Sequence, residues 1–273
     1  MNVIVVCVVL FLFYICLCCR EYTHVEEKAV ICCLTRGYET VDRYDKLIKR
    51  NASLSQLPWV MKYDHVIFHE GNISLDHQRY IASRTTLSLR FVNIRDTFTR
   101  SSNAVVDEYL CKPSSWSDGY KRMCRFWFVD FWDYVKEYQY LVRFDEDVVV
   151  SKNCKDPIDY CKRNNLHYAT PYLMTEHRAV IDGLDRFTGR TFKEIDRVPA
   201  THTQMIHLPY YTNNPKVKAF INRIDQSGCI LHNRWGDAPL MGILVREFTN
   251  TEEYDFNWKG FVGYHGSHNN NYN

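Results

Sequence analysis

Two aspartates, separated by one residue, directly follow a short apolar segment. Asp145 and Asp147 flank Glu146, and residues 140–144 before them have the pattern of a buried β-strand. Ligands of open α/β sheets bind beyond the carboxyl ends of the strands, so these acids are expected at a binding edge. Carboxylates suit Mg²⁺ or Mn²⁺, and such a cation can hold the diphosphate of a sugar nucleotide. Paired aspartates are also common in solvated acidic turns, which is the plainer interpretation.

A second segment, residues 234–239, combines an indole ring with a carboxylate in the sequence Arg-Trp-Gly-Asp-Ala-Pro. Trp235 offers an apolar face for a sugar ring, and Asp237 can accept hydrogen bonds from sugar hydroxyls. Asp237 also precedes Ala238 and Pro239, so it equally fits the N-cap of a following helix. The two roles are compatible.

Alternating strands and helices are predicted to position these segments. Apolar runs and periodicity predict strands over 29–35, 65–68, 89–94, 140–144 and 168–171, and helices over 39–49, 76–83, 118–137, from 156, 215–226 and 238–245. Residues 101–117 are expected to form a loop. The alternation predicts an α/β sandwich with a mostly parallel sheet, and the absence of a linker or repeat predicts one domain.

Composition excludes several classes of protein. The chain has 273 residues, of which 46% are hydrophobic and 24% charged, and this excludes a disordered or collagen-like protein. The net charge is +2 and no long basic run occurs, so nucleic-acid binding is not expected.

The N-terminal residues are apolar, and residues 3–19 contain no charge. This length is at the lower limit for a membrane span and also suits the core of a signal peptide. Arg20 follows directly and no basic residue precedes the run, so an anchor and a cleaved signal both stay open. Residues 1–19 are therefore predicted as a signal anchor or signal peptide, residues 20–28 as a short stem, and residues 29–273 as the functional domain.

Two further features agree with passage through the secretory pathway. Asn51 and Asn72 begin Asn-x-Ser triplets, which are acceptors for N-glycosylation. Four of the 11 cysteines lie in residues 3–19, and the remaining seven allow at most three disulfides with one thiol left over. Their spacings do not suit zinc, so a few structural disulfides are expected.

Three segments in order carry a family resemblance. Residues 120–126 (Tyr-Lys-Arg-Met-Cys-Arg-Phe) resemble the motif Y-R-x-M-C-R-F, residues 143–148 (Arg-Phe-Asp-Glu-Asp-Val) resemble R-V-E-P-D-V, and residues 234–239 match R-W-G-D-A-P. Weaker likenesses occur at residues 63–68 and 263–265, to Y-D-W-V-F and G-Y-x-H. With this set, most of residues 29–265 resembles the fungal Golgi α-1,2-mannosyltransferases of glycosyltransferase family 15.

The resemblance implies a GT-A fold, GDP-mannose as donor, Mn²⁺ (or Mg²⁺) as cofactor and retention of the anomeric configuration. Asp145 and Asp147 stand at the family's two acids, and His265 stands at its metal-ligating histidine. Glu146 replaces a proline and is expected to face solvent. Tyr120 matches an active-site tyrosine. The resemblance thus implies metal ligation by Asp145, Asp147 and His265, catalytic roles for Tyr120, Arg234 and Asp237, and nucleotide-sugar binding by Arg36, Asp145, Tyr120 and Trp235. Plainer alternatives are a surface role for His265 and Arg36 and helix packing for Tyr120.

One departure concerns the mechanism. The family carries a glutamate in an N-F-E-I segment, its candidate nucleophile, and the corresponding residues 203–206 place Gln204 or Met205 there. Double displacement therefore lacks its expected residue. Front-face transfer needs none, because the departing diphosphate oxygen itself takes the acceptor's proton.

The sequence therefore predicts a metal-dependent glycosyltransferase of protein glycosylation, with residues 29–273 as catalytic domain. It would move mannose from GDP-mannose to a glycan acceptor in the secretory lumen. A single-pass type II protein of the Golgi or ER membrane is expected if residues 3–19 are kept, and a secreted protein otherwise. The alternatives are a transferase for another nucleotide sugar, such as a UDP-sugar, and an inert carbohydrate-binding relative.

Overall fold

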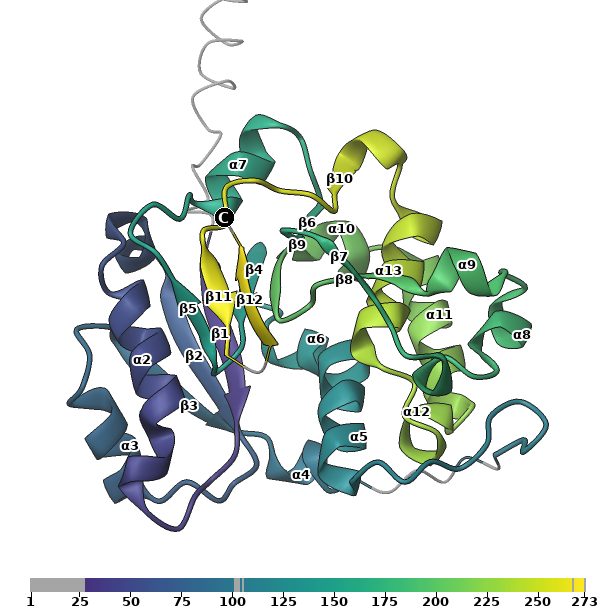
Figure 1. Ribbon diagram of the computed structural model, residues 1–273, viewed down its shortest axis with the longest axis horizontal. Helices are drawn as coiled ribbons and strands as arrows, with labels where there is room; N and C mark the ends of the chain where they lie inside the picture. Colours follow the sequence, from purple (N-terminus) through teal and green to yellow (C-terminus); the bar gives the residue numbers. More distant parts are fainter. Residues whose placement is uncertain (1–27, 101–103, 105, 267, 273) are drawn as a thin grey trace, which may run out of the picture.

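A seven-stranded sheet runs through the computed structural model, which describes residues 28–100, 104, 106–266 and 268–272. The strand order is β10-β6-β9-β4-β1-β2-β3 (Figure 1). Neighbours are parallel from β3 through β2 and β1 to β4 and between β10 and β6, whereas β9 is antiparallel to both β4 and β6. The predicted mostly parallel α/β fold is confirmed. The strands of this sheet are β1 (Ala29–Thr35), β2 (Asp64–His69), β3 (Leu89–Asn93), β4 (Tyr140–Phe144), β6 (Tyr168–Ala169), β9 (Thr203–His207) and β10 (Tyr254–Asp255).

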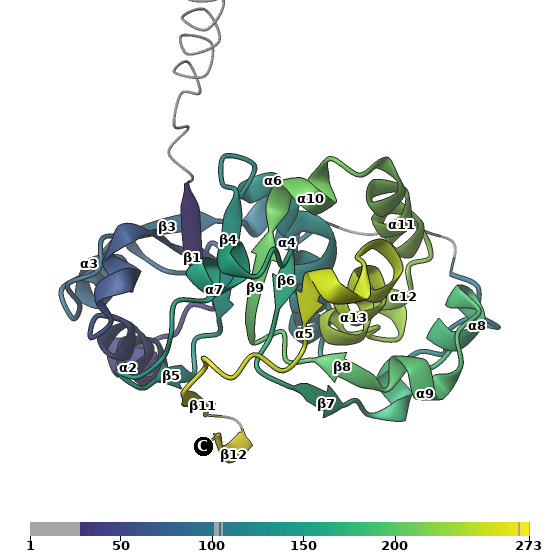
Figure 2. The ribbon, with the colours of Figure 1, turned by 90° about the horizontal axis from the view of Figure 1, so that it is seen from above.

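Helices cover both faces of this sheet (Figure 2). Alternate residues of β1 enter different cores, because successive side chains of a strand point to opposite faces. Val30 packs with residues of α5, α11 and α13, whereas Ile31 packs with residues of α2 and α7. The helices are α2 (Asp45–Leu54), α3 (Leu75–Ala82), α4 (Arg95–Phe98), α5 (Asp118–Arg125), α6 (Phe131–Tyr134), α7 (Pro157–Arg163), α8 (Leu184–Thr188), α9 (Phe192–Ile195), α10 (Leu208–Thr212), α11 (Pro215–Gln226), α12 (Cys229–His232) and α13 (Asp237–Phe248), with 3₁₀ turns at Val41–Tyr44, Pro58–Lys62, Arg178–Val180 and Thr251–Glu253.

Two small sheets carry chain segments to the carboxyl ends of β1 and β4. The first has the order β12-β11-β5, and its strand β11 pairs antiparallel with β5. The second is the antiparallel pair of β7 and β8. Their strands are β5 (Val148–Val150), β7 (Leu173–Thr175), β8 (Arg197–Pro199), β11 (Gly263–His265) and β12 (His268–Tyr272). Because β5 directly follows the acidic residues, its pairing with β11 brings the end of the chain beside them.

The sequence predicted strands β1 and β4 and helix α11 with the bounds that the structure has. The helix predicted over 118–137 is divided into α5, a π-helical turn (Phe126–Asp130) and α6, and it ends earlier than expected. Strand β9 was not predicted, because its sequence Thr-Gln-Met-Ile-His lacks a clear apolar run. The segments predicted over 1–19 and 20–27 lie outside the described residues.

The cysteines differ from expectation. A disulfide joins Cys111 to Cys229. Within the described residues the other cysteines are buried free thiols, so the expectation of a few disulfides is wrong there; these thiols are Cys32, Cys33, Cys124, Cys154 and Cys161. They pack as small apolar side chains, as buried cysteines commonly do.

The prediction of N-glycosylation is also wrong for one of the two acceptor asparagines. Asn51 lies in α2 with 1% of its surface exposed, and its Oδ1 accepts a hydrogen bond from Arg50. The folded domain therefore has no room for a glycan at this side chain. Asn72 is exposed, and it stays a prediction. In a separate finding, none of the helices formed by the described residues is long and apolar enough to cross a bilayer.

Candidate active site

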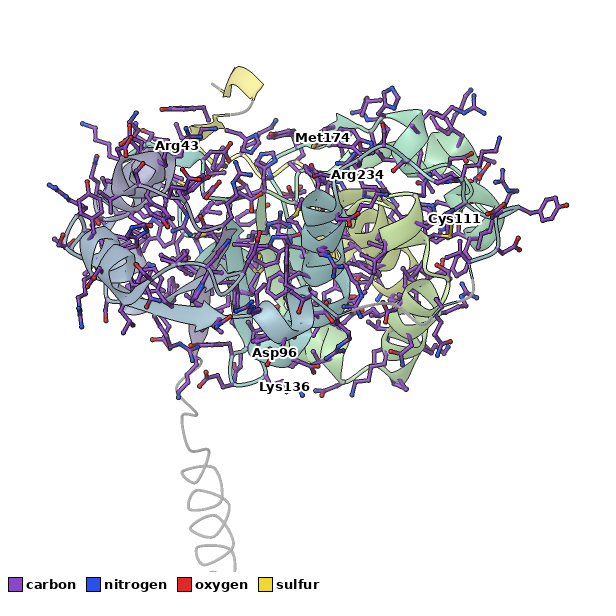
Figure 3. The ribbon with its side chains drawn as sticks, turned by 90° about the horizontal axis from the view of Figure 1, so that it is seen from below. Arg43, Asp96, Cys111, Lys136, Met174 and Arg234 are labelled. Carbon is purple, nitrogen blue, oxygen red and sulfur yellow. A yellow bond between two sulfur atoms is a disulfide. The ribbon has the colours of Figure 1, made fainter. Side chains whose placement is uncertain are left out.

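A cavity of about 490 Å³ lies beyond the carboxyl ends of β1 and β4. Its wall comes from the acidic turn after β4, from α5, from the residues before β9, from the start of α13 and from β11. Met174 of β7 and Arg234 both line it, and Figure 3 shows these two residues near each other. Segments far apart in sequence thus meet at the edge where the sequence placed the acids.

The register of the sheet explains which acidic side chain points where. Cys32 of β1 pairs with Arg143 of β4, so Thr35 comes opposite Glu146, whose carboxylate accepts a hydrogen bond from the Thr35 hydroxyl. On the other side β4 pairs with β9, and the amide of Asp145 donates to the carbonyl of His202 at 3.0 Å. Glu146 is therefore turned toward β1.

Glu146 was expected to face solvent, and this expectation is wrong. Its side chain also accepts a hydrogen bond from the Tyr38 hydroxyl at 3.3 Å, and the residue is half-buried. Burial raises the pKa of the Glu146 carboxyl, although the Thr35 hydroxyl opposes the rise. Glu146 thus ties the acidic turn to the end of β1.

Arg143 is the buried centre of the site. Its Nε and Nη2 donate to the two oxygens of Asp145 at 2.6 and 3.0 Å, and its Nη1 donates to Asp237 Oδ2 at 2.6 Å. The guanidinium carbon lies 4.2 Å from the centre of the Trp127 ring. Burial opposes its charge, but Asp145 and Asp237 hold the pKa of Arg143 above its ordinary value. One cation thereby orients two carboxylates that are 92 residues apart in the chain.

The second aspartate pairs with the C-terminal histidine. Asp147 Oδ1 lies 2.9 Å from His265 Nε2, and the amide of Gly266 donates to the Asp147 carbonyl at 2.9 Å. The His265 ring stacks on His202, with centroids 4.3 Å apart. Asp147 and His265, predicted as metal ligands, are therefore in contact, whereas Asp145 is turned toward Arg143. Among the residues that the structure describes, no three acidic, histidine or cysteine side chains are gathered as a metal cluster.

Arg234 packs over two aromatic rings in another part of the cavity wall. Its guanidinium carbon is 4.1 Å from the ring centres of both Trp116 and Tyr120. The residue has a φ of 87° and is 7% exposed, and its Nε is buried without a hydrogen-bond partner in the described part of the chain. Burial raises the pKa of Tyr120 to about 12 although Arg234 opposes it, so the phenol stays protonated at neutral pH.

Asp237 occupies the first residue of α13, and Gly236 is its N-cap. The expectation that Asp237 is the N-cap of this helix is wrong, because Gly236 holds that position and Asp237 is already helical. Its Oδ2 instead accepts from Arg143 and from the Thr201 hydroxyl, at 2.6 and 3.1 Å. Oδ1 is therefore the oxygen that Asp237 can offer to a ligand hydroxyl.

Trp235 does not line the cavity, and its predicted role as a sugar platform is wrong. The indole is fully buried, its Nε1 donates to the carbonyl of Asp182 at 2.8 Å, and its ring meets Phe187 edge to face. Arg234 on one side and Gly236 on the other do line the cavity. Trp235 thus anchors the segment from the core.

We expect Trp235→Ala to lower the free energy of unfolding by about 3–5 kcal/mol, because it leaves a cavity where a large ring was packed. Urea denaturation followed by circular dichroism measures this loss. Trp59→Ala, at a half-buried indole away from the cavity, is the matched control and should cost less. An equal, small loss in both variants would contradict the anchoring role.

Two further positions singled out in the sequence are Arg36, predicted to bind the nucleotide, and the position of the family's glutamate. Arg36 is exposed, lies outside the cavity lining, and has its guanidinium carbon 5.2 Å from the Tyr38 ring centre. Gln204, which stands at the family's glutamate, is buried and accepts a hydrogen bond from Tyr168 at 2.6 Å. Met205 points to the opposite face of the sheet, into the other core. Neither residue supplies a nucleophile.

Glu176, after β7, lines the cavity and was not predicted. Its Oε1 accepts from the amide of His177 at 2.9 Å, and burial raises the pKa of its carboxyl. No sequence signal near it is specific, because the antiparallel pairing of β7 with β8 brings it near Arg234 and Gly236.

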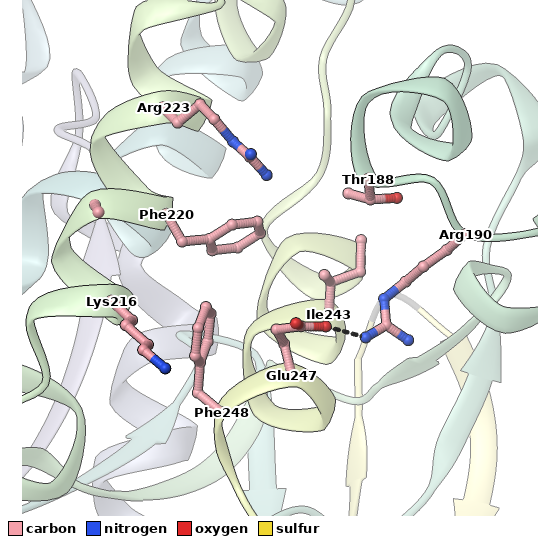
Figure 4. Close-up of a pocket in the computed structure, with 9 residues that line it drawn as sticks. Thr188, Arg190, Lys216, Phe220, Arg223, Ile243, Glu247 and Phe248 are labelled. Atoms are coloured by element: carbon pink, nitrogen blue, oxygen red, sulfur yellow. Dashed lines mark hydrogen bonds and ion pairs between the residues drawn. The ribbon is translucent and has the colours of Figure 1, made fainter.

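A second cavity, of about 360 Å³, lies between α11, α13 and the residues after α8 (Figure 4). Phe220, Ile243 and Phe248 form its apolar part, and Glu247 pairs with Arg190 across it. Glu247 is the one carboxylate in its lining, and it is already paired with Arg190. The cavity at the strand ends, with its several acids and histidines, is therefore the candidate active site.

Comparison with known proteins agrees with the resemblance seen in the sequence. No family model matches the chain. The O-glycoside α-1,2-mannosyltransferase omh1 of Schizosaccharomyces pombe is 25% identical over 163 residues, in a match that covers 51% of this chain and 42% of that protein. The match thus spans less than half of the relative's length.

Solved structures share the fold. Core-mannan synthase A (CmsA/Ktr4) of Aspergillus fumigatus, in its Mn/GDP form, has a TM-score of 0.70 at 14% identity and covers 90% of this chain and 76% of its own. The mannosyltransferase Ktr4p of S. cerevisiae in complex with GDP has a TM-score of 0.69 at 14% identity, with coverages of 88% and 71%. Mouse xyloside xylosyltransferase 1 has a TM-score of 0.53 at 10% identity, with coverages of 84% and 83%. The chain therefore has the GT-A-like fold and resembles the fungal α-1,2-mannosyltransferases.

Proposed function

We propose that this protein is a metal-dependent retaining mannosyltransferase that uses GDP-mannose and a glycan acceptor. The observation that supports it is the arrangement of polar groups around one cavity: Asp147 contacts His265, and the buried Arg234 has an Nε without a hydrogen-bond partner among the described residues. A buried donor of this kind is costly to leave unpaired, and the diphosphate of a sugar nucleotide would accept its hydrogen bond. The named relatives support mannose as the transferred sugar.

The residues present fit a manganese or magnesium ion. Asp147 Oδ1 and His265 Nε2 lie 2.9 Å apart, Asp147 and His265 both line the cavity, and these two atoms would hold the ion. A carboxylate with an imidazole is a donor set that manganese accepts. Arg143 occupies two of about four acceptor positions of Asp145, so Asp145 retains lone pairs toward the cavity.

In the proposed reaction the acceptor hydroxyl oxygen bonds to the anomeric carbon on the face from which the diphosphate leaves. The bond from this carbon to the phosphate oxygen breaks, and that oxygen takes the hydroxyl proton. A bound cation would neutralise charge on the departing diphosphate. Arg234 and the protonated Tyr120, which also line the cavity, stabilise the same charge. Asp237, held by Arg143 and Thr201, orients a sugar hydroxyl.

The proposed site of action is the lumen of the secretory pathway. Residues 3–19 supply the targeting segment, as signal peptide or type II anchor, and the Cys111–Cys229 disulfide fits an oxidising compartment. Asn72, which is exposed, would carry a glycan there.

A donor screen tests the proposal. The full chain is incubated with Mn²⁺, a mannoside acceptor and, separately, GDP-mannose, UDP-glucose, UDP-galactose and UDP-xylose, and the released nucleotide is measured. We expect release from GDP-mannose, and NMR of the product should show an α-linkage. Release from a UDP-sugar alone would show that GDP-mannose is not the donor, and it would leave the assignment of the fold unchanged. A β-linked product would show that the reaction does not retain the anomeric configuration.

A further inference from the structure

An exposed aromatic ring stands at the rim of the cavity. Trp116 is 44% exposed although tryptophan is usually covered, and its ring centre lies 5.4 Å from that of Tyr120, which lines the cavity. Trp116 itself is absent from the cavity lining. Tyr120 is itself 40% exposed, so the two rings form one continuous apolar patch, and an exposed patch of this kind beside a polar cavity points to a surface that a ligand covers.

A cation packs against the ring of Trp116. The Arg234 guanidinium carbon lies 4.1 Å from the centre of each of the Trp116 and Tyr120 rings, and the two ring centres are 5.4 Å apart, so the cation packs over both rings from one side. Arg234 therefore covers one face of the Trp116 indole, and we assign the exposed area of Trp116 to the other face. Such a half-covered ring offers one flat apolar surface of fixed orientation.

The loop that carries Trp116 is held in place from several directions. The disulfide joins Cys111 of this loop to Cys229 at the start of α12. The side-chain Nδ2 of Asn233 donates to the Lys112 carbonyl at 2.8 Å, and Lys121 Nζ donates to the carbonyls of Ser114 and His232 at 3.1 and 3.0 Å. The loop is thus fixed to the segment that presents Arg234. A ring fixed before binding loses little conformational entropy when a ligand stacks on it.

A carboxylate faces the same part of the cavity. Glu176 lies near Arg234 and Gly236, and no hydrogen bond from the described residues reaches its Oε2. Trp116 and Glu176 both neighbour Arg234, and a flat apolar ring together with a carboxylate that can accept hydrogen bonds suits a pyranose, which has one apolar face and hydroxyls at its edge.

We propose that Trp116 is a platform for the acceptor glycan and determines acceptor specificity. The inference rests on the proposed function. The sugar that is attacked lies in the cavity, and the next sugar of the acceptor stacks on the open face of Trp116, with Glu176 accepting hydrogen bonds from the hydroxyls between them. Because Trp116 lies outside the cavity lining, it acts on acceptors of two or more sugars.

Trp116→Ala tests the platform, with Tyr109→Ala as matched control. Tyr109 is on the same loop and 93% exposed, and its carbonyl, not its ring, contacts Arg186. For an α-linked mannose disaccharide we expect Trp116→Ala to raise the acceptor KM about tenfold, which equals about 1.4 kcal/mol. For methyl α-mannoside the change should stay below twofold. Tyr109→Ala should leave both values unchanged, and Trp116→Phe should recover part of the disaccharide affinity.

A binding measurement separates failure of the platform from failure of the proposed function. Saturation-transfer NMR with the disaccharide should show contact from aromatic protons to the second sugar in wild type and lose it in Trp116→Ala. GDP affinity, measured by calorimetry with Mn²⁺, should differ less than twofold between the two proteins. If GDP does not bind wild type, the proposed function is wrong. If GDP binds and Trp116→Ala matches Tyr109→Ala, or both acceptors weaken equally, the platform is wrong.

Discussion

Replacing Asp147 with asparagine is expected to reduce Mn²⁺-dependent release of GDP from GDP-mannose by about a thousandfold. The substitution keeps the shape of the side chain and removes the charge that faces His265 at 2.9 Å. Metal stabilisation of a leaving group supplies several kcal/mol, and a thousandfold loss corresponds to about 4 kcal/mol. Initial rates at saturating donor, with Mn²⁺ varied, measure the effect.

The matched control for Asp147 is Asp133→Asn, at an exposed aspartate paired with Lys136. It should retain the wild-type rate and the wild-type affinity for Mn²⁺, followed by electron paramagnetic resonance. His265→Ala should resemble Asp147→Asn in both readouts. If Asp147→Asn kept its activity and its affinity for Mn²⁺, the metal would have to lie elsewhere.

We expect Arg143→Met to lower the free energy of unfolding by about 3–5 kcal/mol, because it leaves the carboxylates of Asp145 and Asp237 without their cation in a buried place. Methionine roughly keeps the length of the side chain, so the loss reports the charge more than the packing. Urea denaturation measures it, and GDP binding should be lost at the same time because both carboxylates become free to turn.

Two further variants separate charge from packing at Arg143. Arg163→Met, at an exposed arginine paired with Asp159, should change stability by less than about 1 kcal/mol. Adding Asp145→Asn and Asp237→Asn to Arg143→Met should recover part of the stability, because no uncompensated charge is then left. A triple variant less stable than Arg143→Met would contradict this explanation.

The strands that position the acids were predictable because they are buried on both faces. Residues 29–35 and 140–144 are nearly continuous apolar runs, and such runs are typical of parallel strands covered by helices. The acids follow the second run directly, so their place at the edge of the sheet was predictable too. Strand β9 was not, because Gln204 and Thr203 owe their burial to partners in β4 and β6.

The roles of the two tryptophans show where sequence reasoning failed. Trp235 lies inside the strongest motif, and a sugar platform was the expectation, but tertiary packing against Phe187 and Asp182 buries it completely. Trp116 lies in a segment predicted only as a loop, yet it is the ring that stands open beside Arg234. Which indole is covered depends on contacts between residues more than 40 positions apart, and spacing along the chain carries no information about them.

The same limit applies to the carboxylates. Asp145 and Asp147 were found because they are neighbours in sequence, whereas Glu176 reaches the cavity through the β7–β8 pair. Glu146 was assigned to solvent because its partner Thr35 is 111 residues away, and the register between β1 and β4 decides the contact.

Calorimetric titration of the full chain with GDP, in Mn²⁺ and then in EDTA, tests the central claim most directly, because it requires neither acceptor nor turnover. We expect saturable binding of one GDP with Mn²⁺. Binding should be at least tenfold weaker in EDTA, in Asp147→Asn and in Arg234→Gln. Absence of GDP binding in the presence of Mn²⁺, or binding indifferent to EDTA and to both substitutions, would contradict it.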